Sequence, residues 1–146
     1  MTEEQIEKTV WLNRAFHTKH AIGALESVRN EKQSMAASCG MNYENDGSTN
    51  GSGENRQEQK LINLCEIDHK INQARKELIR IYSEIETVIN NVEDIELRAV
   101  LTYHYLSYMT WETVAEKMNY SVRTVKYKHK KALDKVCIVL HPASVI

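Results

Sequence analysis

Residues that end or bend secondary structure are scarce in this sequence, whose 146 residues include one proline, five glycines and one phenylalanine. A β-sandwich or barrel needs many turns and many β-branched or aromatic strand positions, so this composition argues against an all-β fold. No apolar run reaches the roughly 18–20 residues that a membrane-spanning helix needs. Residues 1–10 are acidic and amphipathic, which is typical of neither a signal peptide nor a transit peptide.

Cysteine is also scarce, and its pattern indicates a reducing compartment. Cys39, Cys65 and Cys137 lie far apart, are odd in number and form no CxxC pair, as expected for free thiols in the cytoplasm. The sequence has no Gly-rich phosphate loop, no GxSxG or HExxH motif and no paired carboxylates in an apolar setting. We therefore expect neither an enzyme nor a metal or cofactor site.

The net charge of -1 conceals an uneven distribution of cations. Residues 111–136 contain seven lysines or arginines against three carboxylates, which leaves the rest of the chain acidic. The seven cations are Lys117, Arg123, Lys126, Lys128, Lys130, Lys131 and Lys135. A basic block of this kind favours an anionic partner.

The first half of the chain predicts a helix followed by a linker. Residues 1–33 contain no proline and predict one N-terminal helix with a broad apolar face. That face comprises Ile6, Val10, Ala21, Ala24 and Val28, flanked by Trp11, Ala15, Ile22 and Leu25. Residues 34–56 hold four of the five glycines with many serines and asparagines, a composition that predicts a flexible linker.

Residues 57–92 carry the most regular hydrophobic pattern in the chain. Aliphatic residues alternate at spacings of three and four from Leu64 to Val92, which predicts a long coiled-coil-like helix ending near Asn90-Asn91. The side chains expected to mediate oligomerisation are Leu64, Ile67, Ile71, Leu78, Ile81, Ile85 and Val88. We favour a homodimer through this arm. The alternatives are an intramolecular hairpin with residues 1–33, which Asn13, His17 and His20 would interrupt, or a four-helix dimer that combines both.

Residues 94–140 predict three short helices, before a tail at 141–146. The expected helices are 95–106, capped by Asp94; 111–118, capped by Thr110; and 122–137, capped by Ser121. A short helix, a tight turn and a second, basic helix form the pattern of a helix-turn-helix. Ala115 is small where the helices would cross, and Asn119 occupies the turn position that demands positive φ.

The last of these helices contains the residues that we expect to bind duplex DNA. They are Ser121, Arg123, Thr124, Lys126, Tyr127, Lys128, Lys130 and Lys131. Arg123 and Lys126, with Tyr127, lie near the start of the helix, from which side chains reach base edges in the major groove. The later lysines are candidates for phosphate contacts, and the amides behind Ser121 are free for a phosphate. His129, Trp111 and the nearby tyrosines are interpreted as packing residues.

Residues 97–136 resemble region four of sigma factors, and resemble more closely the small sigma-like regulators of phages and prophages in Gram-positive bacteria. These regulators include late-gene activators and the autolysin-regulator family. The matching residues are Leu97-Arg98, Tyr105, Trp111-Glu112, Val114-Ala115, Tyr120-Ser121, Thr124-Val125, His129 and Ala132-Leu133. The resemblance implies sequence-specific DNA binding and control of phage or mobile-element transcription together with the host RNA polymerase. Since sigma regions two and three are missing, an activator fits better than an autonomous sigma factor.

Two other functions fit the same pattern. A phage small-terminase-like packaging protein also joins a helix-turn-helix to an oligomerising helical part, and a ring-shaped assembly would favour it. A helical protein-interaction module would instead use the basic helix to dock on an acidic protein, and its binding would survive loss of Arg123 and Lys126.

Overall fold

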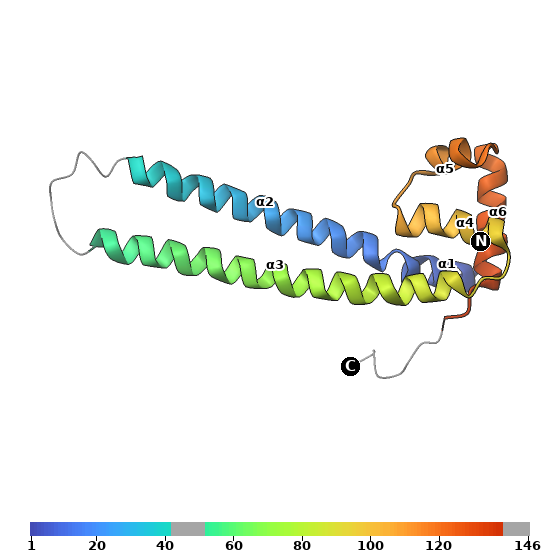
Figure 1. Cartoon of the computed structure of the whole chain (residues 1–146), viewed down its shortest axis with the longest axis horizontal. Coiled ribbons are helices and arrows are strands. Elements are labelled where there is room, and N and C mark those ends of the chain that lie inside the picture. Colours follow the sequence, from blue (N-terminus) through green and yellow to red (C-terminus); the bar gives the residue numbers. More distant parts are fainter. Residues whose placement is uncertain (42–51, 139–146) are drawn as a thin grey trace. The chain divides into compact units, whose positions relative to one another are not determined.

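The computed structural model describes residues 1–41 and 52–138, with side chains described for 1–37 and 58–138. Within these ranges the chain forms helices and turns and contains no strand, which confirms the all-α prediction. The elements are α1 (Glu3–Leu12), α2 (Arg14–Met41), α3 (Ser52–Asn90), α4 (Ile95–Leu101), the π-helical turn η2 (Thr102–Leu106), α5 (Trp111–Met118) and α6 (Val122–Lys135). Figure 1 labels the α-helices.

The N-terminal segment forms two helices, so the prediction of a single helix over residues 1–33 is wrong. α1 ends at Leu12 and α2 begins at Arg14, with Asn13 between them. The Trp11 carbonyl accepts a hydrogen bond from Nε of Arg14 at 3.1 Å. A side chain that inserts in this way into the helical hydrogen-bond ladder is a known cause of helix kinks.

The apolar face predicted for this segment is also wrong. Ile6, Val10 and Val28 are exposed, whereas Ala15 and Ile22, which were predicted to flank the face, are buried. The prediction assumed one straight helix, and the break at Asn13 removes the common face that links the two halves.

The linker predicted over residues 34–56 is longer than the segment between α2 and α3. α2 continues to Met41 and α3 begins at Ser52, so both helices extend into the range 34–56. Residues 42–51, the middle of that range, lie outside the described residues. Alanine and methionine at 35–37 are good helix formers, which explains why the helix continues beyond residue 33.

The chain divides into two compact units. The first unit combines residues 1–17 with the described residues from 78 onward, and the second unit comprises Thr18–Glu77. Each unit therefore contains parts of α2 and α3.

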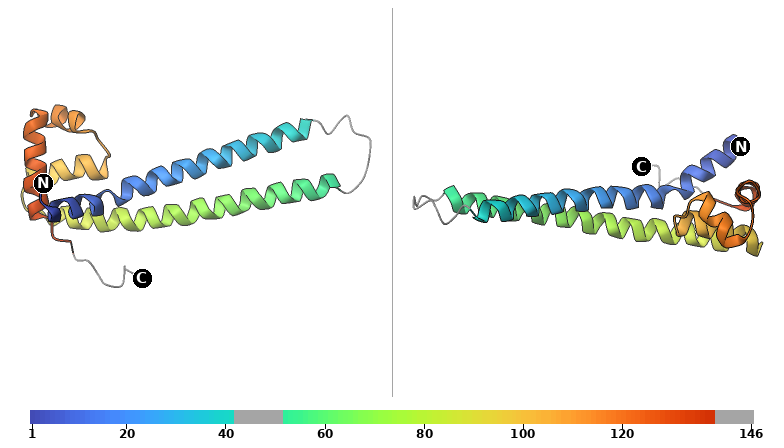
Figure 2. Two further views of the ribbon diagram at one scale, coloured as in Figure 1. Left: turned by 180° about the vertical axis from the view of Figure 1, so that it is seen from behind. Right: turned by 90° about the horizontal axis from the view of Figure 1, so that it is seen from above.

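The second unit is a pair of antiparallel helices. Its α2 and α3 parts run side by side in opposite directions in every view of Figures 1 and 2. Ile22, Ile67 and Ile71 are buried, while Leu64 and Ala74 are half-buried. This unit thus covers its part of the heptad pattern within the chain.

Ion pairs link the two helices of the second unit at its surface. Arg29 pairs with Asp68, and an Arg75 guanidinium nitrogen lies 2.5 Å from the Glu26 carboxylate. Exposed ion pairs contribute little stability, typically about 0–1 kcal/mol each. Their positions do match the antiparallel register, because the residue nearer the start of α2 pairs with the residue nearer the end of the α3 segment.

The first unit contains the main hydrophobic core. This core joins residues of α1, the start of α2, α3, α4, η2 and α6: Leu12, Ala15, Ile81, Ile85, Ile89, Val92, Leu97, Leu101, Tyr105, Leu106, Ala132, Leu133 and Val136. Leu78 and Val88 pack against it and are partly buried. Ile89 is fully buried although it is not one of the residues of the predicted heptad pattern. Near the end of α3 a different face of the helix therefore packs against the core.

The residues predicted to mediate oligomerisation are thus packed within one chain. Four of them, Ile67, Ile71, Ile81 and Ile85, are buried, and the other three are half-buried. This packing agrees with the intramolecular hairpin, while the homodimer and the four-helix dimer stay predictions.

Candidate nucleic-acid interface

α5 and α6 begin where their capping residues predict. Thr110 Oγ1 accepts the Thr113 amide at 3.3 Å, and Ser121 Oγ accepts the Thr124 amide at 3.1 Å. Each cap satisfies one of the amides that a helix N-terminus leaves unpaired. The start of α6 therefore has a fixed position next to the turn that precedes it.

Asn119 shapes the turn between the two helices. Its backbone adopts the left-handed conformation, with φ 57 and ψ 40, which confirms the prediction of positive φ. The Tyr120 amide donates to the Ala115 carbonyl at 3.0 Å and the Asn119 amide to the Glu116 carbonyl at 3.3 Å. These two bonds form a Schellman motif, which ends α5 and directs the chain into α6.

A small apolar cluster holds α5 against α6 and α4. Its buried members are Val100, Val114, Ala115 and Val125. Ala115 is 4% exposed and lies within this cluster, as expected for a small residue between packed helices. A larger side chain at this position would force the helices apart.

A hydrogen-bonded aromatic cluster supports the inner side of α6. The Tyr105 hydroxyl lies 2.7 Å from Nε2 of His129, and the His104 ring stacks on Trp111 with centroids 3.7 Å apart. Nδ1 of His104 donates to the Met109 carbonyl at 2.8 Å. The interpretation of His129, Trp111 and Tyr105 as packing residues is therefore confirmed.

Burial controls the charge of this cluster. It lowers the pKa of His129 to about 4, with further lowering by the charges of His104 and Lys130. Burial also lowers the pKa of His104, against the opposing effect of its bond to Met109, and raises the pKa of Tyr105 to about 12. The cluster is consequently neutral at pH 7, and the basic character of α6 comes from its outer face alone.

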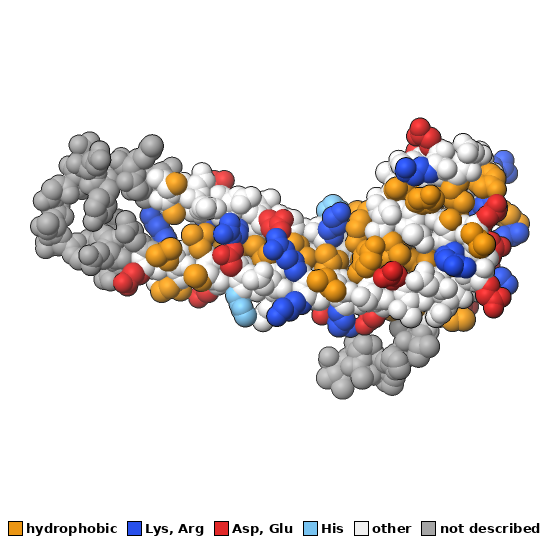
Figure 3. All heavy atoms as spheres, viewed as in Figure 1, with side chains coloured by type: hydrophobic (Ala, Val, Ile, Leu, Met, Phe, Trp, Pro, Cys, Tyr) orange, Lys and Arg blue, Asp and Glu red, His pale blue; other side chains and the backbone are white. Residues whose placement is uncertain are grey.

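The outer face of α6 presents most of the predicted DNA-binding residues to solvent. The exposed residues are Ser121, Arg123, Lys126, Tyr127, Lys130 and Lys131, and Thr124 is half-exposed. Tyr127 is 59% exposed, and Nζ of Lys131 lies 4.7 Å from the centroid of its ring. Arg123, Tyr127 and Lys131 are four residues apart in turn, so they form one stripe along the helix. Figure 3 shows Lys and Arg side chains, with a few acidic ones among them, along the edge at which Figure 1 places α6.

Lys128 differs from the other predicted phosphate contacts because an acidic residue of α4 engages it. Its Nζ lies 2.5 Å from the Glu96 carboxylate and 4.9 Å from the centroid of the Tyr120 ring. The Tyr120 hydroxyl donates to the same carboxylate at 2.9 Å. Hydrogen bonds from Lys128 and then Tyr120 lower the pKa of Glu96, so this ion pair is intact at neutral pH.

Sequence reasoning missed the residues of α1 that contact α6. Nε2 of Gln5 lies 2.8 Å from the Asp134 carboxylate and 3.4 Å from the Lys130 carbonyl oxygen. Nζ of Lys8 donates to the Leu133 carbonyl at 3.0 Å. The Thr2–Gln5 capping box marks the start of α1 in the sequence, but no local signal identifies a partner 125 residues away.

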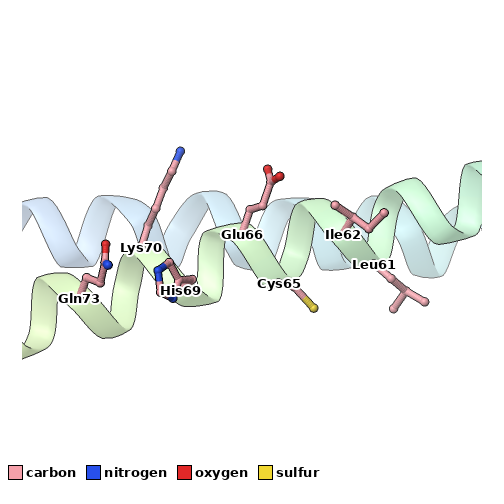
Figure 4. A pocket seen from close by; sticks show the side chains of 7 residues that line it. All are labelled: Leu61, Ile62, Cys65, Glu66, His69, Lys70 and Gln73. Carbon is pink, nitrogen blue, oxygen red and sulfur yellow. The ribbon is translucent and has the colours of Figure 1, made fainter.

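The second unit has a surface hollow that offers no comparable site. Its lining comes from successive turns of α3 alone: Leu61, Ile62, Cys65, Glu66, His69, Lys70 and Gln73. Figure 4 shows these side chains pointing in different directions rather than converging on one point.

Within the described parts of the chain, no three His, Cys, Asp or Glu side chains are placed to hold a metal ion. Among the same residues, no helix is long and apolar enough to cross a membrane. Cys65 and Cys137 are free thiols, and the side chain of Cys39 lies outside the described residues.

Comparison with known proteins places the chain in a family. A family model described as "Protein of unknown function (DUF1492)" matches residues 41–136, about two thirds of the chain. The matched range runs from the end of α2 through α6 and excludes α1. No curated protein and no solved structure matches the chain.

Proposed function

Because the chain belongs to the DUF1492 family, whose description states no function, we propose one from the site itself: the protein binds duplex DNA and regulates transcription. In this proposal α5, the turn at Asn119 and α6 form a helix-turn-helix, and α6 is its recognition helix. No catalytic step is assigned to the protein.

The observation that carries the proposal is the outer face of α6. Arg123, Lys126, Lys130 and Lys131 are exposed there, while the opposite face is buried and neutral. An α-helix fits the major groove of B-DNA, which is about 12 Å wide. Arg123, at the second position of the helix, and Lys126 are the candidates for contacts with base edges, and Arg123 suits a bidentate contact with guanine. Lys130 and Lys131 are candidates for phosphate contacts.

Tyr127 supports readout of base edges in addition to phosphate binding. It projects from the middle of the basic stripe and is 59% exposed, so its ring is accessible to a bound duplex. Its ring offers an apolar surface to a thymine methyl group, and the ammonium of Lys131 beside it is attracted to a phosphate.

The regulatory role rests on the resemblance of residues 97–136 to region four of sigma factors. We place the protein among activators of phage or mobile-element genes that act in the cytoplasm with the host RNA polymerase. The packing of the α3 seam within one chain provides no support for the oligomerising arm that a packaging protein would need.

The test is a salt titration of binding to a mixed-sequence DNA duplex, followed by fluorescence anisotropy. The variants are Arg123→Ala/Lys126→Ala on α6 and, as a control with the same change of charge, Lys70→Ala/Lys76→Ala on the exposed part of α3. Each neutralised phosphate adds about -0.9 to the slope of log K against log salt. We expect a slope of several units for the wild type and affinity at least about tenfold lower for the α6 variant only.

Two outcomes would contradict the proposal. A folded wild-type protein that does not bind DNA at low salt would exclude the DNA-binding role and leave the protein-interaction alternative. Equal losses in the two double variants would show that net charge, and not the face of α6, determines binding. If the wild type binds and only the α6 variant is weakened, selection from a random pool of duplexes identifies the preferred site.

A further inference from the structure

The C-terminal turn of α6 is held by residues from the opposite end of the chain. Gln5, which is 8% exposed, directs Nε2 toward the Asp134 carboxylate at 2.8 Å and the Lys130 carbonyl at 3.4 Å. Nζ of Lys8 donates to the Leu133 carbonyl at 3.0 Å, and Leu12 is fully buried in the same core as Leu133. Figure 1 shows α1 beside the end of α6.

These contacts reinforce the end of this helix, where the Val136 amide also donates to the Ala132 and Leu133 carbonyls. The last four carbonyl groups of an α-helix have no partner within the helix, and a cation near them interacts favourably with the helix dipole. The Lys8 side chain is 13% exposed, and its ammonium lies 2.8 Å from the Glu4 carboxylate while it donates to the Leu133 carbonyl at this end of α6. Gln5 satisfies the only carboxylate of α6, Asp134, without adding charge.

The composition of α6 increases the importance of this support. The helix carries six cations and one carboxylate, and several of its lysines lie four residues apart, including Lys126 with Lys130 and Lys131 with Lys135. Like charges at this spacing destabilise a helix. Contacts from outside the helix therefore add to the stability of its last turns, and these turns carry Lys130 and Lys131.

We propose that Gln5 and Lys8 of α1 are positioning residues for DNA binding: they hold the last turns of α6 so that Lys130 and Lys131 meet the phosphate backbone. The inference rests on the proposed function. It adds α1 to the DNA-binding unit, which the sequence predicts to comprise residues 94–140 alone. α1 itself need not touch DNA.

The key variant is Gln5→Glu. It preserves the size of the side chain and the acceptor that receives the Thr2 amide, but it replaces the amide donor with a second carboxylate oxygen facing Asp134. The pair Gln5→Glu/Asp134→Asn exchanges donor and acceptor and restores the net charge of the wild type. Val10→Glu adds a carboxylate to the exposed face of α1 and is the control for charge alone.

The readouts are the salt slope of DNA binding and amide hydrogen exchange, on variants shown to be folded by circular dichroism. For Gln5→Glu we expect the slope to fall by about 2, since each lost phosphate contact removes about 0.9. We expect amide exchange at 132–136 to accelerate about tenfold, with α5 unchanged, and the exchanged pair to recover most of both effects. Lys130→Ala/Lys131→Ala should lower the slope in the wild type and have no further effect in the Gln5→Glu background.

The two proposals fail in different ways. If the wild type binds DNA and folded Gln5→Glu retains the wild-type slope, the positioning role is wrong and the DNA-binding role stands. If Gln5→Glu and Val10→Glu lower the slope equally, the effect comes from charge and the positioning role is again wrong. If the wild type does not bind DNA, both proposals fall.

Discussion

The Tyr105 hydroxyl and Nε2 of His129 lie 2.7 Å apart inside the first unit, where Tyr105 is 2% exposed and His129 is 5% exposed. Tyr105 belongs to η2 and His129 to α6, so the bond fixes the inner side of the candidate recognition helix to the segment that precedes α5. Since burial keeps the His129 ring neutral at pH 7, Nε2 is able to accept a hydrogen bond from the Tyr105 hydroxyl.

Removing the Tyr105 hydroxyl leaves this nitrogen buried without its partner. We expect Tyr105→Phe to lower the free energy of unfolding by about 1–3 kcal/mol, the usual cost of an unsatisfied buried polar group. Urea denaturation measures the change. Tyr103→Phe, at a partly buried neighbour, is the matched control, and an equal loss in both variants would attribute the effect to the loss of any hydroxyl in this segment.

The depressed pKa of His129 makes stability depend on pH. In the unfolded chain the ring binds a proton below its ordinary pKa of 6.5, whereas the folded protein binds it only near 4. Unfolding therefore takes up a proton between these values, and the free energy of unfolding falls as the pH is lowered from about 6.5 to 4. Because one pKa unit corresponds to about 1.4 kcal/mol, the full effect is about 3 kcal/mol.

Substitution of the ring isolates its share of this pH dependence. We expect His129→Gln to have a flatter stability profile than the wild type between pH 7 and 4.5 in urea denaturation. His69→Gln, at an exposed histidine of α3, should retain the wild-type profile. A His129→Gln profile parallel to that of the wild type would place the pH dependence at other groups.

Asn119 tests the geometry of the turn. Its φ of 57 lies in the left-handed region, where a residue with a Cβ atom is strained and glycine is not. We expect Asn119→Ala to destabilise the protein by about 1 kcal/mol and Asn119→Gly to be neutral or slightly stabilising. Thermal unfolding of the two variants checks the order, and an alanine variant as stable as the glycine variant would argue against the left-handed turn.

The pairing of Lys128 with Glu96 predicts a difference among the lysines of α6. We expect Lys128→Ala to reduce DNA affinity less than Lys131→Ala, because the Lys128 ammonium is already engaged by a carboxylate. Glu96→Gln should release Lys128 and increase the salt slope by about 0.9, the contribution of one phosphate contact. Anisotropy titrations at several salt concentrations compare these variants, and equal losses for the two lysines would mean that DNA displaces Glu96.

The α3 seam predicts stability that does not depend on protein concentration. Ile85→Ala removes a fully buried side chain and should cost about 2–5 kcal/mol, whereas Ile79→Ala, 67% exposed, should cost little. Because the seam packs within one chain, the Tm of the wild type should stay constant over a hundredfold dilution. A Tm that falls on dilution would show that a second copy contributes to stability.

Sequence reasoning succeeded where structure depends on a few consecutive residues. The caps at Asp94, Thr110 and Ser121 and the turn at Asn119 each involve a side chain and backbone groups within four residues. The end of α3 at Asn90 was also predicted, although neither Asn90 nor Asn91 has the left-handed backbone that the prediction assumed.

It failed where the outcome depends on tertiary contacts. The heptad pattern of α3 shows that a seam must be buried, but a pattern on one helix does not identify what covers it. The contacts of Gln5 and Lys8 with α6 were out of reach for the same reason, since both residues look like ordinary polar positions on an amphipathic helix.

The docking of α1 on α6 has a consequence for biosynthesis. The chain emerges from the ribosome N-terminus first, so α1 leaves the exit tunnel long before the residues near 130 that receive it have been translated. The first unit is completed only when α6 follows, and its folding must close a loop of 125 residues. The second unit needs only residues 18–77 and is available to fold earlier. A nascent chain arrested before α6 would thus carry α1 without the helix on which it docks.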